Sequence, residues 1–151
     1  NIVYFAAGYG VGSTAIEIAD DNSTEELWFL EGNEPVTNHW STPLVKDGYL
    51  YGMFGFKEYG DGPLKCVELK TGKVMWEKSG YGPAGVCLSG DVLVCLGDRG
   101  QVSLVEATPK EYNELSRMDR VVKGKCWSSP IFADGKILIR STEEAACLNL
   151  K

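Results

Sequence analysis

The sequence of 151 residues has one histidine, no closely spaced cysteine pair and no long apolar run. A membrane-spanning helix needs roughly 18 or more consecutive apolar residues, so we expect no membrane span. The 15 basic residues are scattered and outnumbered by 21 acidic ones, and the resulting net charge of −6 argues against a nucleic-acid partner. The five cysteines are an odd number without CxxC spacing, which predicts neither a complete disulfide framework nor a zinc site.

The sequence does contain a repeated phrase. WSTPLVKDGYLY at residues 40–51 returns as WSSPIFADGKIL at 127–138, with a weaker copy, GPAGVCLSGDVL, at 82–93. The turn glycines Gly48, Gly90 and Gly135 are 42 and 45 residues apart. This period is typical of blades of four short strands in a β-propeller.

The spacing of turns and β-branched residues predicts almost no helix. The second repeat shows all four strands, at 42–46, 49–54, 64–69 and 73–77, whereas the first repeat lacks its first strand and the fourth lacks its last. We therefore predict an all-β fold, a partial β-propeller with two complete and two incomplete antiparallel blades. The predicted blades are 1–35 (second to fourth strands), 36–80, 81–123 and 124–151 (first to third strands).

Such an arc cannot close into a ring by itself, because a propeller needs about four to eight blades packed face to face. The expected partners are therefore missing blades of the same protein or another copy of this chain. The chain also begins directly in a strand, at Ile2, without an initiator Met. We expect it to be part of a longer product.

The phrase Ser-x-Pro-x-x-x-Asp-Gly, followed by LKCVELKTGKVMW from residue 64, resembles the repeat of pyrroloquinoline-quinone-like β-propellers. This superfamily includes quinoprotein alcohol dehydrogenases and an outer-membrane assembly lipoprotein. The resemblance implies that Trp28 and Trp76 dock one blade onto the next, with Leu115 at the corresponding position of the third repeat. It also implies that the chain is the C-terminal half of a larger extracytoplasmic protein, periplasmic or secreted.

In this family, ligands usually sit on the face where the connections before the first strand and after the second strand open. The resemblance therefore gives a set of candidate ligand-binding residues: His39, Trp40, Tyr81, Arg99, Trp127 and Arg140, with Phe56, Tyr59 and Asp61 in the long loop of the second repeat. Aromatic rings interleaved with charges can bind a sugar or a peptide by stacking and hydrogen bonding. The alternative is that Trp40 and Trp127 pack between blades and that His39 is a solvated loop residue.

The quinoprotein resemblance further implies a quinone cofactor, held between a tryptophan and a disulfide of adjacent cysteines beside an Asp base and calcium. No two cysteines here are adjacent, and no Gly-x-Ser-x-Gly motif is present. We expect a non-catalytic scaffold for protein interaction or ligand binding, without cofactor, catalytic residues or metal ligands. The alternatives are part of a PQQ-dependent dehydrogenase or a carbohydrate-binding propeller.

The cysteines are expected to be small, inward-facing strand residues, because free cysteine is among the most buried residue types. Cys66 and Cys147 occupy the same place in their repeats, within LKCVEL and AACLNL. The sequence therefore predicts that both are buried.

Overall fold

The computed structural model describes residues 1–32, 35–55 and 62–150, which form fourteen strands and no helix. The strands make four antiparallel sheets, in the orders β1-β2-β3, β4-β5-β6-β7, β11-β10-β9-β8 and β12-β13-β14, here called sheets 1 to 4. The prediction of an all-β fold with two four-stranded and two three-stranded blades is confirmed. The strand bounds are β1 Ile2–Ala7, β2 Gly12–Ile18, β3 Thr24–Glu31, β4 Leu44–Lys46, β5 Tyr49–Met53, β6 Leu64–Glu68, β7 Val74–Lys78, β8 Gly85–Ser89, β9 Val92–Leu96, β10 Val102–Glu106, β11 Glu114–Met118, β12 Ile131–Ala133, β13 Lys136–Arg140 and β14 Ala145–Asn149.

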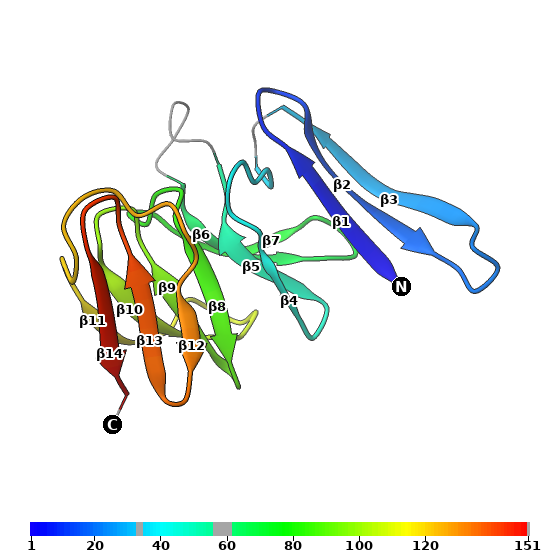
Figure 1. Cartoon of the computed structure of the whole chain (residues 1–151). Helices are drawn as coiled ribbons and strands as arrows, with labels where there is room; N and C mark the ends of the chain where they lie inside the picture. Colours follow the sequence, from blue (N-terminus) through cyan, green and yellow to red (C-terminus); the bar gives the residue numbers. More distant parts are fainter. Residues whose placement is uncertain (33–34, 56–61, 151) are drawn as a thin grey trace.

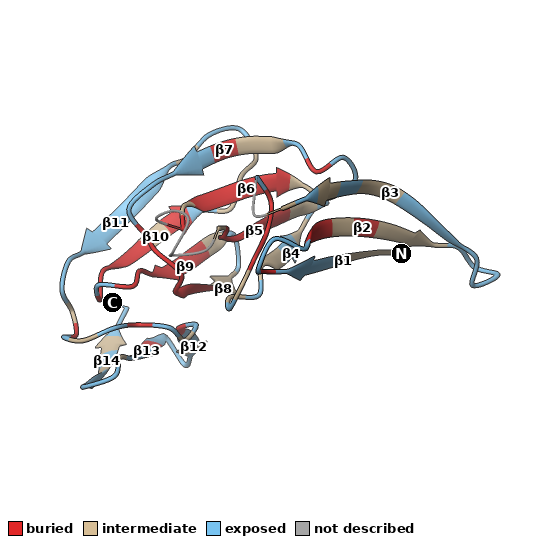
Figure 2. Cartoon of the chain, turned by 90° about the horizontal axis from the view of Figure 1, so that it is seen from above, coloured by how far each residue is buried: buried red, intermediate tan, exposed pale blue. Residues whose placement is uncertain are grey.

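The four sheets follow one another along an arc (Figure 1). Seen from above, β3, β7 and β11 lie on the outer rim, while β4, β8 and β12 lie on the inner side (Figure 2). Strand β8 contacts β4 and β5 on one side and β12 on the other. Three apolar clusters fill the spaces between successive sheets, one for each pair. Burial between neighbouring sheets is therefore the main source of stability in the arc.

Tight turns fix the pairing of the inner strands. Asp47 and Gly48 have φ of 49° and 83°, and Asp134 and Gly135 have φ of 50° and 69°. Two successive residues with positive φ form the type I′ turn that matches strand twist, and Asp-Gly is a preferred sequence for it. The turns pair Lys46 with Tyr49 in sheet 2 and Ala133 with Lys136 in sheet 4.

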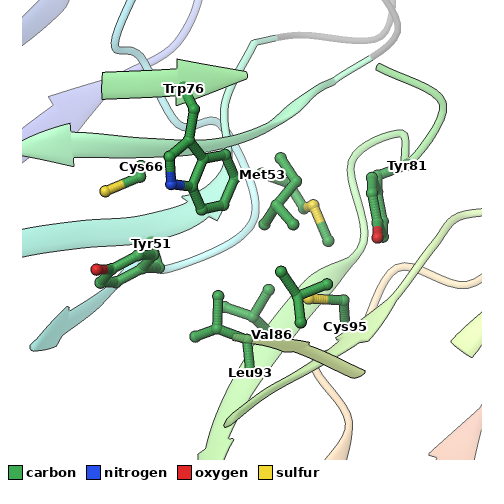
Figure 3. Close-up of a cluster of buried hydrophobic side chains, with 10 residues drawn as sticks. Tyr51, Met53, Cys66, Trp76, Tyr81, Val86, Leu93 and Cys95 are labelled. Atoms are coloured by element: carbon green, nitrogen blue, oxygen red, sulfur yellow. The ribbon is translucent and has the colours of Figure 1, made fainter. Parts of the chain in front are cut away.

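Trp76 connects sheet 2 to sheet 3. Its side chain is 8% exposed and lies in the cluster between these sheets, near Tyr51 and Met53 (Figure 3). The indole Nε1–H donates a 2.7 Å hydrogen bond to the carbonyl oxygen of Thr108, and the ring meets Tyr112 edge-on at 5.7 Å. The neighbouring sheet thus both buries the ring and accepts the hydrogen bond from its one donor.

Trp28 makes the corresponding contact from sheet 1 to sheet 2. Its Nε1–H donates to the carbonyl oxygen of Leu69 at 2.9 Å. Gly72 lies against the ring, since a Cβ added there would be 3.0 Å from the indole. The two tryptophans therefore dock on the outer turn of the next sheet in the same way.

The register of the outer strands corrects the position expected for Leu115. Each outer strand has a β-bulge, and the residue inside it is Leu27, Met75 or Leu115. Trp28 and Trp76 follow the bulge and pair with Ala15 and Cys66, so the equivalent in sheet 3 is Ser116, which pairs with Leu104. The prediction that Leu115 takes the tryptophan position is wrong by one residue. All of β11 is exposed, and no indole docks sheet 3 onto sheet 4.

Candidate functional site

A row of aromatic rings lies on the side of the arc where the connections before the innermost strands meet the β1–β2 turn. Tyr9 comes from the β1–β2 turn, His39 and Trp40 from the segment before β4, and Trp127 from the segment before β12. Ring centroids are 4.6 Å apart for Tyr9–His39, 4.6 Å for His39–Trp40 and 5.6 Å for Trp40–Trp127. These distances lie within or close to the usual range for aromatic pairs. The four rings, here called the aromatic row, therefore join sheets 1, 2 and 4.

The row remains open to solvent. Tyr9 is 75% exposed, Trp40 50% and Trp127 47%. The Lys125 ammonium lies 5.3 Å from the Trp127 ring centroid, within cation–π range. Exposed apolar side chains gathered in one patch mark a candidate contact site.

Sheet 3 contributes no aromatic ring to the row, because glycine stands at the corresponding position. Trp40, Gly82 and Trp127 each stand eight residues before their turn glycine, so Gly82 is the sheet 3 equivalent of the two tryptophans. Gly82 has φ +72°, and an added Cβ would be 2.3 Å from the Asp98 side chain. A side chain at this position would be strained by the positive φ and crowded by Asp98, so glycine is required there.

A hollow of about 150 Å³ lies beside Trp127. Its lining consists of that indole, two cationic side chains and three hydroxyl side chains: Lys125, Trp127, Ser128, Arg140, Ser141 and Thr142. Thr142 Oγ1 accepts a hydrogen bond from the Lys125 backbone N–H at 3.1 Å, and the Thr142 N–H donates to the Lys125 carbonyl at 3.0 Å. This reciprocal pair holds the two sides of the hollow together.

The structure brings some of the sequence-predicted site residues together and separates others. His39, Trp40 and Trp127 belong to the aromatic row, and Arg140 lines the hollow. Arg99 is exposed but does not line the hollow. Phe56, Tyr59 and Asp61 lie outside the described residues.

Tyr81 does not present its ring to a ligand as the sequence suggested. It is 0% exposed, and its hydroxyl is 2.5 Å from Ser103 Oγ and 3.0 Å from the Tyr112 hydroxyl. Burial raises the pKa of the Tyr81 hydroxyl, so this group is neutral at ordinary pH. The expectation of an exposed Tyr81 beside Trp40 and Trp127 is wrong because the ring fills the core between sheets 2 and 3.

Sequence reasoning missed Tyr9 and Lys125. Tyr9 has φ +60° between Gly8 and Gly10, and an added Cβ on Gly8 would collide with the His39 ring at 2.0 Å. The GYG triplet was therefore the available signal for close packing against an aromatic residue. Lys125 had a signal too, since it stands two residues before the repeated Trp127.

The last sheet leaves one face uncovered. Leu138 pairs with Ile131 and Cys147 in a row across sheet 4, and Leu138 and Ile131 are 42% and 59% exposed. These residues line a hollow of about 460 Å³. The corresponding row of sheet 2 contains Tyr51 and Cys66, which are buried against sheet 3.

Cys147 is exposed, so the prediction that it is buried like Cys66 is wrong. The repeat equivalence itself holds, because Leu138 pairs with Cys147 as Tyr51 pairs with Cys66. The difference arises because no sheet covers this face of sheet 4 within the described chain.

Sheet 1 has an uncovered face at the other end of the arc. Thr14 pairs with Phe5 and Phe29, and the two rings are 52% and 53% exposed. The corresponding row of sheet 2 is Gly52, Lys65 and Glu77, in which Lys65 Nζ lies 3.0 Å from Glu77 and donates to the Pro35 carbonyl at 2.8 Å. Sheet 1 therefore has an apolar row where sheet 2 has a polar one.

The residues do not fit the quinone cofactor that the sequence resemblance implies. All five cysteines are free thiols, and none has an adjacent cysteine with which to form the expected disulfide. Among the described residues, no group of three His, Cys, Asp or Glu side chains is placed to hold a metal ion. Nor does any helix long and apolar enough for a membrane occur in this part of the chain.

Buried acids in the core predict loss of stability at alkaline pH. Burial raises the pKa of the Cys66 thiol from 9.0 to about 11, and burial also raises the pKa of the Tyr51 hydroxyl above 10. Above pH 9 the unfolded chain loses these protons first, so the stabilisation is complete below about pH 9 and is lost as the pH rises through 11. Urea unfolding between pH 8 and pH 11 measures this decline.

Two cysteine variants provide the test and the control for the alkaline experiment. Cys66→Ala removes one buried acid and should make the decline with pH shallower, whereas exposed Cys147→Ala should leave the slope unchanged. Equal slopes for the two variants and the parent chain would show that ionisation of Cys66 does not contribute.

The fold defines a class: the chain is a β-propeller-like arc of four blades. Among solved structures it is similar to the crystal structure of BamB from Moraxella catarrhalis, with a TM-score of 0.63 and 14% identity over 97% of this chain and 40% of BamB. It is also similar to the computationally designed Ika4 protein, with a TM-score of 0.58 and 13% identity over 99% of this chain and 92% of Ika4.

These similarities concern the fold. The chain spans about two fifths of the length of BamB. No protein-family profile matches the sequence, and no curated protein matches it either.

Proposed function

We propose that the chain is a non-catalytic propeller segment that acts as a protein-interaction scaffold, and that its two uncovered sheet faces bind further sheets of the same repeat. Those sheets belong either to missing blades of the same protein or to another copy of the chain. The similarity to a 40% portion of BamB supports the larger propeller, and an extracytoplasmic location is proposed from the same similarity.

The uncovered face of sheet 4 is the observation that carries this proposal. Ile131, Leu138 and Cys147 are exposed at positions whose equivalents in sheet 2, Leu44, Tyr51 and Cys66, pack against the next sheet. An apolar row of this kind gains stability when it is covered, by about 25 cal/mol for each Å² of apolar surface buried. Its natural cover is therefore another sheet of the same kind.

Sheet 1 offers the matching surface at the other end of the arc. Phe5 and Phe29 flank Thr14 on the face opposite the cluster with sheet 2. Aromatic residues are enriched in the cores of protein interfaces, and surface lysines and glutamates are depleted there. Sheet 1 carries two phenylalanines in the row that holds Gly52, Lys65 and Glu77 in sheet 2. This difference favours an interface on sheet 1.

Solution mass tests the proposal. The 151-residue chain, of 16.5 kDa, is expected to self-associate in a concentration-dependent way in sedimentation velocity experiments, because its two end faces can cover each other. Leu138→Lys, which places a charge in the centre of the sheet 4 row, should shift the distribution strongly toward monomer.

The control is Val11→Lys, since Val11 is 59% exposed but lies in the β1–β2 turn rather than on a sheet face. This variant should associate like the parent chain. A parent chain that stays monomeric at every concentration would overturn the proposal, as would equal effects of the two lysine substitutions.

A further inference from the structure

The hollow beside Trp127 combines an apolar wall with fixed hydrogen-bonding groups. Besides Trp127, its lining includes three residues that carry hydroxyl groups, Ser128, Ser141 and Thr142. Ser141 Oγ accepts hydrogen bonds from the backbone N–H groups of Glu143 (3.1 Å) and Glu144 (2.9 Å) and donates one to the Glu144 carbonyl (3.3 Å), so its role is to hold the turn. The turn that carries two of the three hydroxyls is therefore ordered before any ligand binds, which lowers the entropic cost of binding.

The Trp127 ring is suited to the C–H face of a sugar. A π face attracts positively polarised groups, and the Lys125 ammonium already lies 5.3 Å from its centroid. Trp40 lies 5.6 Å away at an angle of 44°, and both indoles are about half-exposed. The two indoles thus form an angled aromatic platform beside a set of hydroxyl groups.

The charge of the hollow specifies the kind of sugar. Lys125 and Arg140 line it together in a chain whose net charge is −6. Of the two acidic residues on the adjoining turn, Glu144 accepts a 2.8 Å hydrogen bond from the Lys123 N–H, and Glu143 packs against Gly124. Neither acid lines the hollow, so its local charge is positive.

The small volume of the hollow favours a ligand of about one sugar ring. Pockets for drug-sized ligands measure about 300–1,000 Å³, whereas this hollow measures about 150 Å³. An extended peptide would need a longer groove or a free strand edge for its backbone.

We propose that this hollow binds a single saccharide ring carrying a carboxylate, such as a uronic acid. The apolar face of the ring stacks on Trp127 and takes the place of the Lys125 ammonium above the indole. The displaced ammonium and Arg140 pair with the carboxylate, and the sugar hydroxyls bond to Ser128 and Thr142. Arginine suits this role because its guanidinium can bind a carboxylate through two parallel hydrogen bonds.

Titration of the whole chain with glucuronate, followed by NMR of the four indole N–H signals, tests the proposal. The Trp127 signal is expected to move. The signals of Trp28 and Trp76 should stay in place, because their N–H groups are bonded to the Leu69 and Thr108 carbonyls inside the molecule. They serve as internal references.

Two matched arginine variants distinguish specific recognition of the carboxylate from a general effect of the protein's charge on binding. Arg140→Gln should weaken glucuronate binding about tenfold while leaving binding of neutral glucose unchanged. Arg99→Gln removes an exposed arginine that does not line the hollow and should change neither. Trp127→Ala should abolish the binding of both sugars without loss of fold, which circular dichroism checks, since Trp127 is 47% exposed.

Two results would overturn the proposal: the Trp127 signal does not move with glucuronate, or the two arginine variants weaken binding equally. In the first case, a shift caused by a polyglutamate peptide would identify the site as one for acidic peptides. None of these outcomes depends on the association of the sheet faces, because Leu138→Lys monomers can be titrated in the same way.

Discussion

Replacing Trp76 with alanine is expected to lower the free energy of unfolding by about 3–5 kcal/mol, the usual cost of removing a buried large aromatic side chain. The ring is 8% exposed and belongs to the cluster that joins sheets 2 and 3. Its removal leaves a cavity there and also leaves the Thr108 carbonyl without its 2.7 Å hydrogen bond. Urea unfolding followed by circular dichroism gives the difference.

Two further substitutions divide this effect into its parts. Trp76→Phe keeps most of the apolar volume but removes the N–H donor, so about 1 kcal/mol of the loss should remain, together with a smaller packing term. Trp40→Ala removes an indole that is 50% exposed and should cost much less than Trp76→Ala. If Trp40→Ala and Trp76→Ala were equally destabilising, the conclusion that Trp76 docks two sheets and Trp40 contributes little to stability would be wrong.

The contrast between these tryptophans was only partly predictable from the sequence. The repeat showed that Trp40 and Trp127 are equivalent, and that Trp28 and Trp76 form a second set. Periodicity alone cannot tell which set is covered, because exposure depends on what occupies the neighbouring sheet. In the structure, Trp28 and Trp76 each face an outer turn of the next sheet, whereas Trp40 and Trp127 face each other.

The sheets themselves were more predictable. Asp-Gly turns and β-branched segments have local causes, and fourteen strands follow from them in the expected order. The bulges were not predictable in this way. The same bulge precedes the tryptophan in sheets 1 and 2, and alignment of sheet 3 on its bulge at Leu115 places Ser116 at the tryptophan position.

The sequence also could not predict which residues are exposed in the two end sheets. A repeat pattern predicts which face a residue points to, and Cys147 does share its place with Cys66. Burial also needs a second surface opposite that face. Thus Cys66 is buried against sheet 3, and Cys147 is exposed although the local sequence is similar.

Gly82→Ala is expected to be the second strongly destabilising change. Gly82 is the sheet 3 equivalent of Trp40 and Trp127. A Cβ at this position would be 2.3 Å from Asp98 Cγ and 2.7 Å from Asp98 Cβ, so the clash is not limited to the flexible end of the side chain. Together with the cost of φ +72° for alanine, we expect a loss of about 2–4 kcal/mol of unfolding free energy.

Gly80→Ala isolates the cost of backbone conformation from the cost of crowding. Gly80 has φ +95° with nothing within 4 Å of an added Cβ, so its substitution should cost only the backbone strain, about 1–2 kcal/mol. The excess for Gly82→Ala then measures the clash with Asp98, and the Trp40 and Trp127 indole signals should shift because the segment between sheets 2 and 4 must move. Equal stabilities of the two alanine variants would mean that Asp98 moves aside freely and that crowding at position 82 costs nothing.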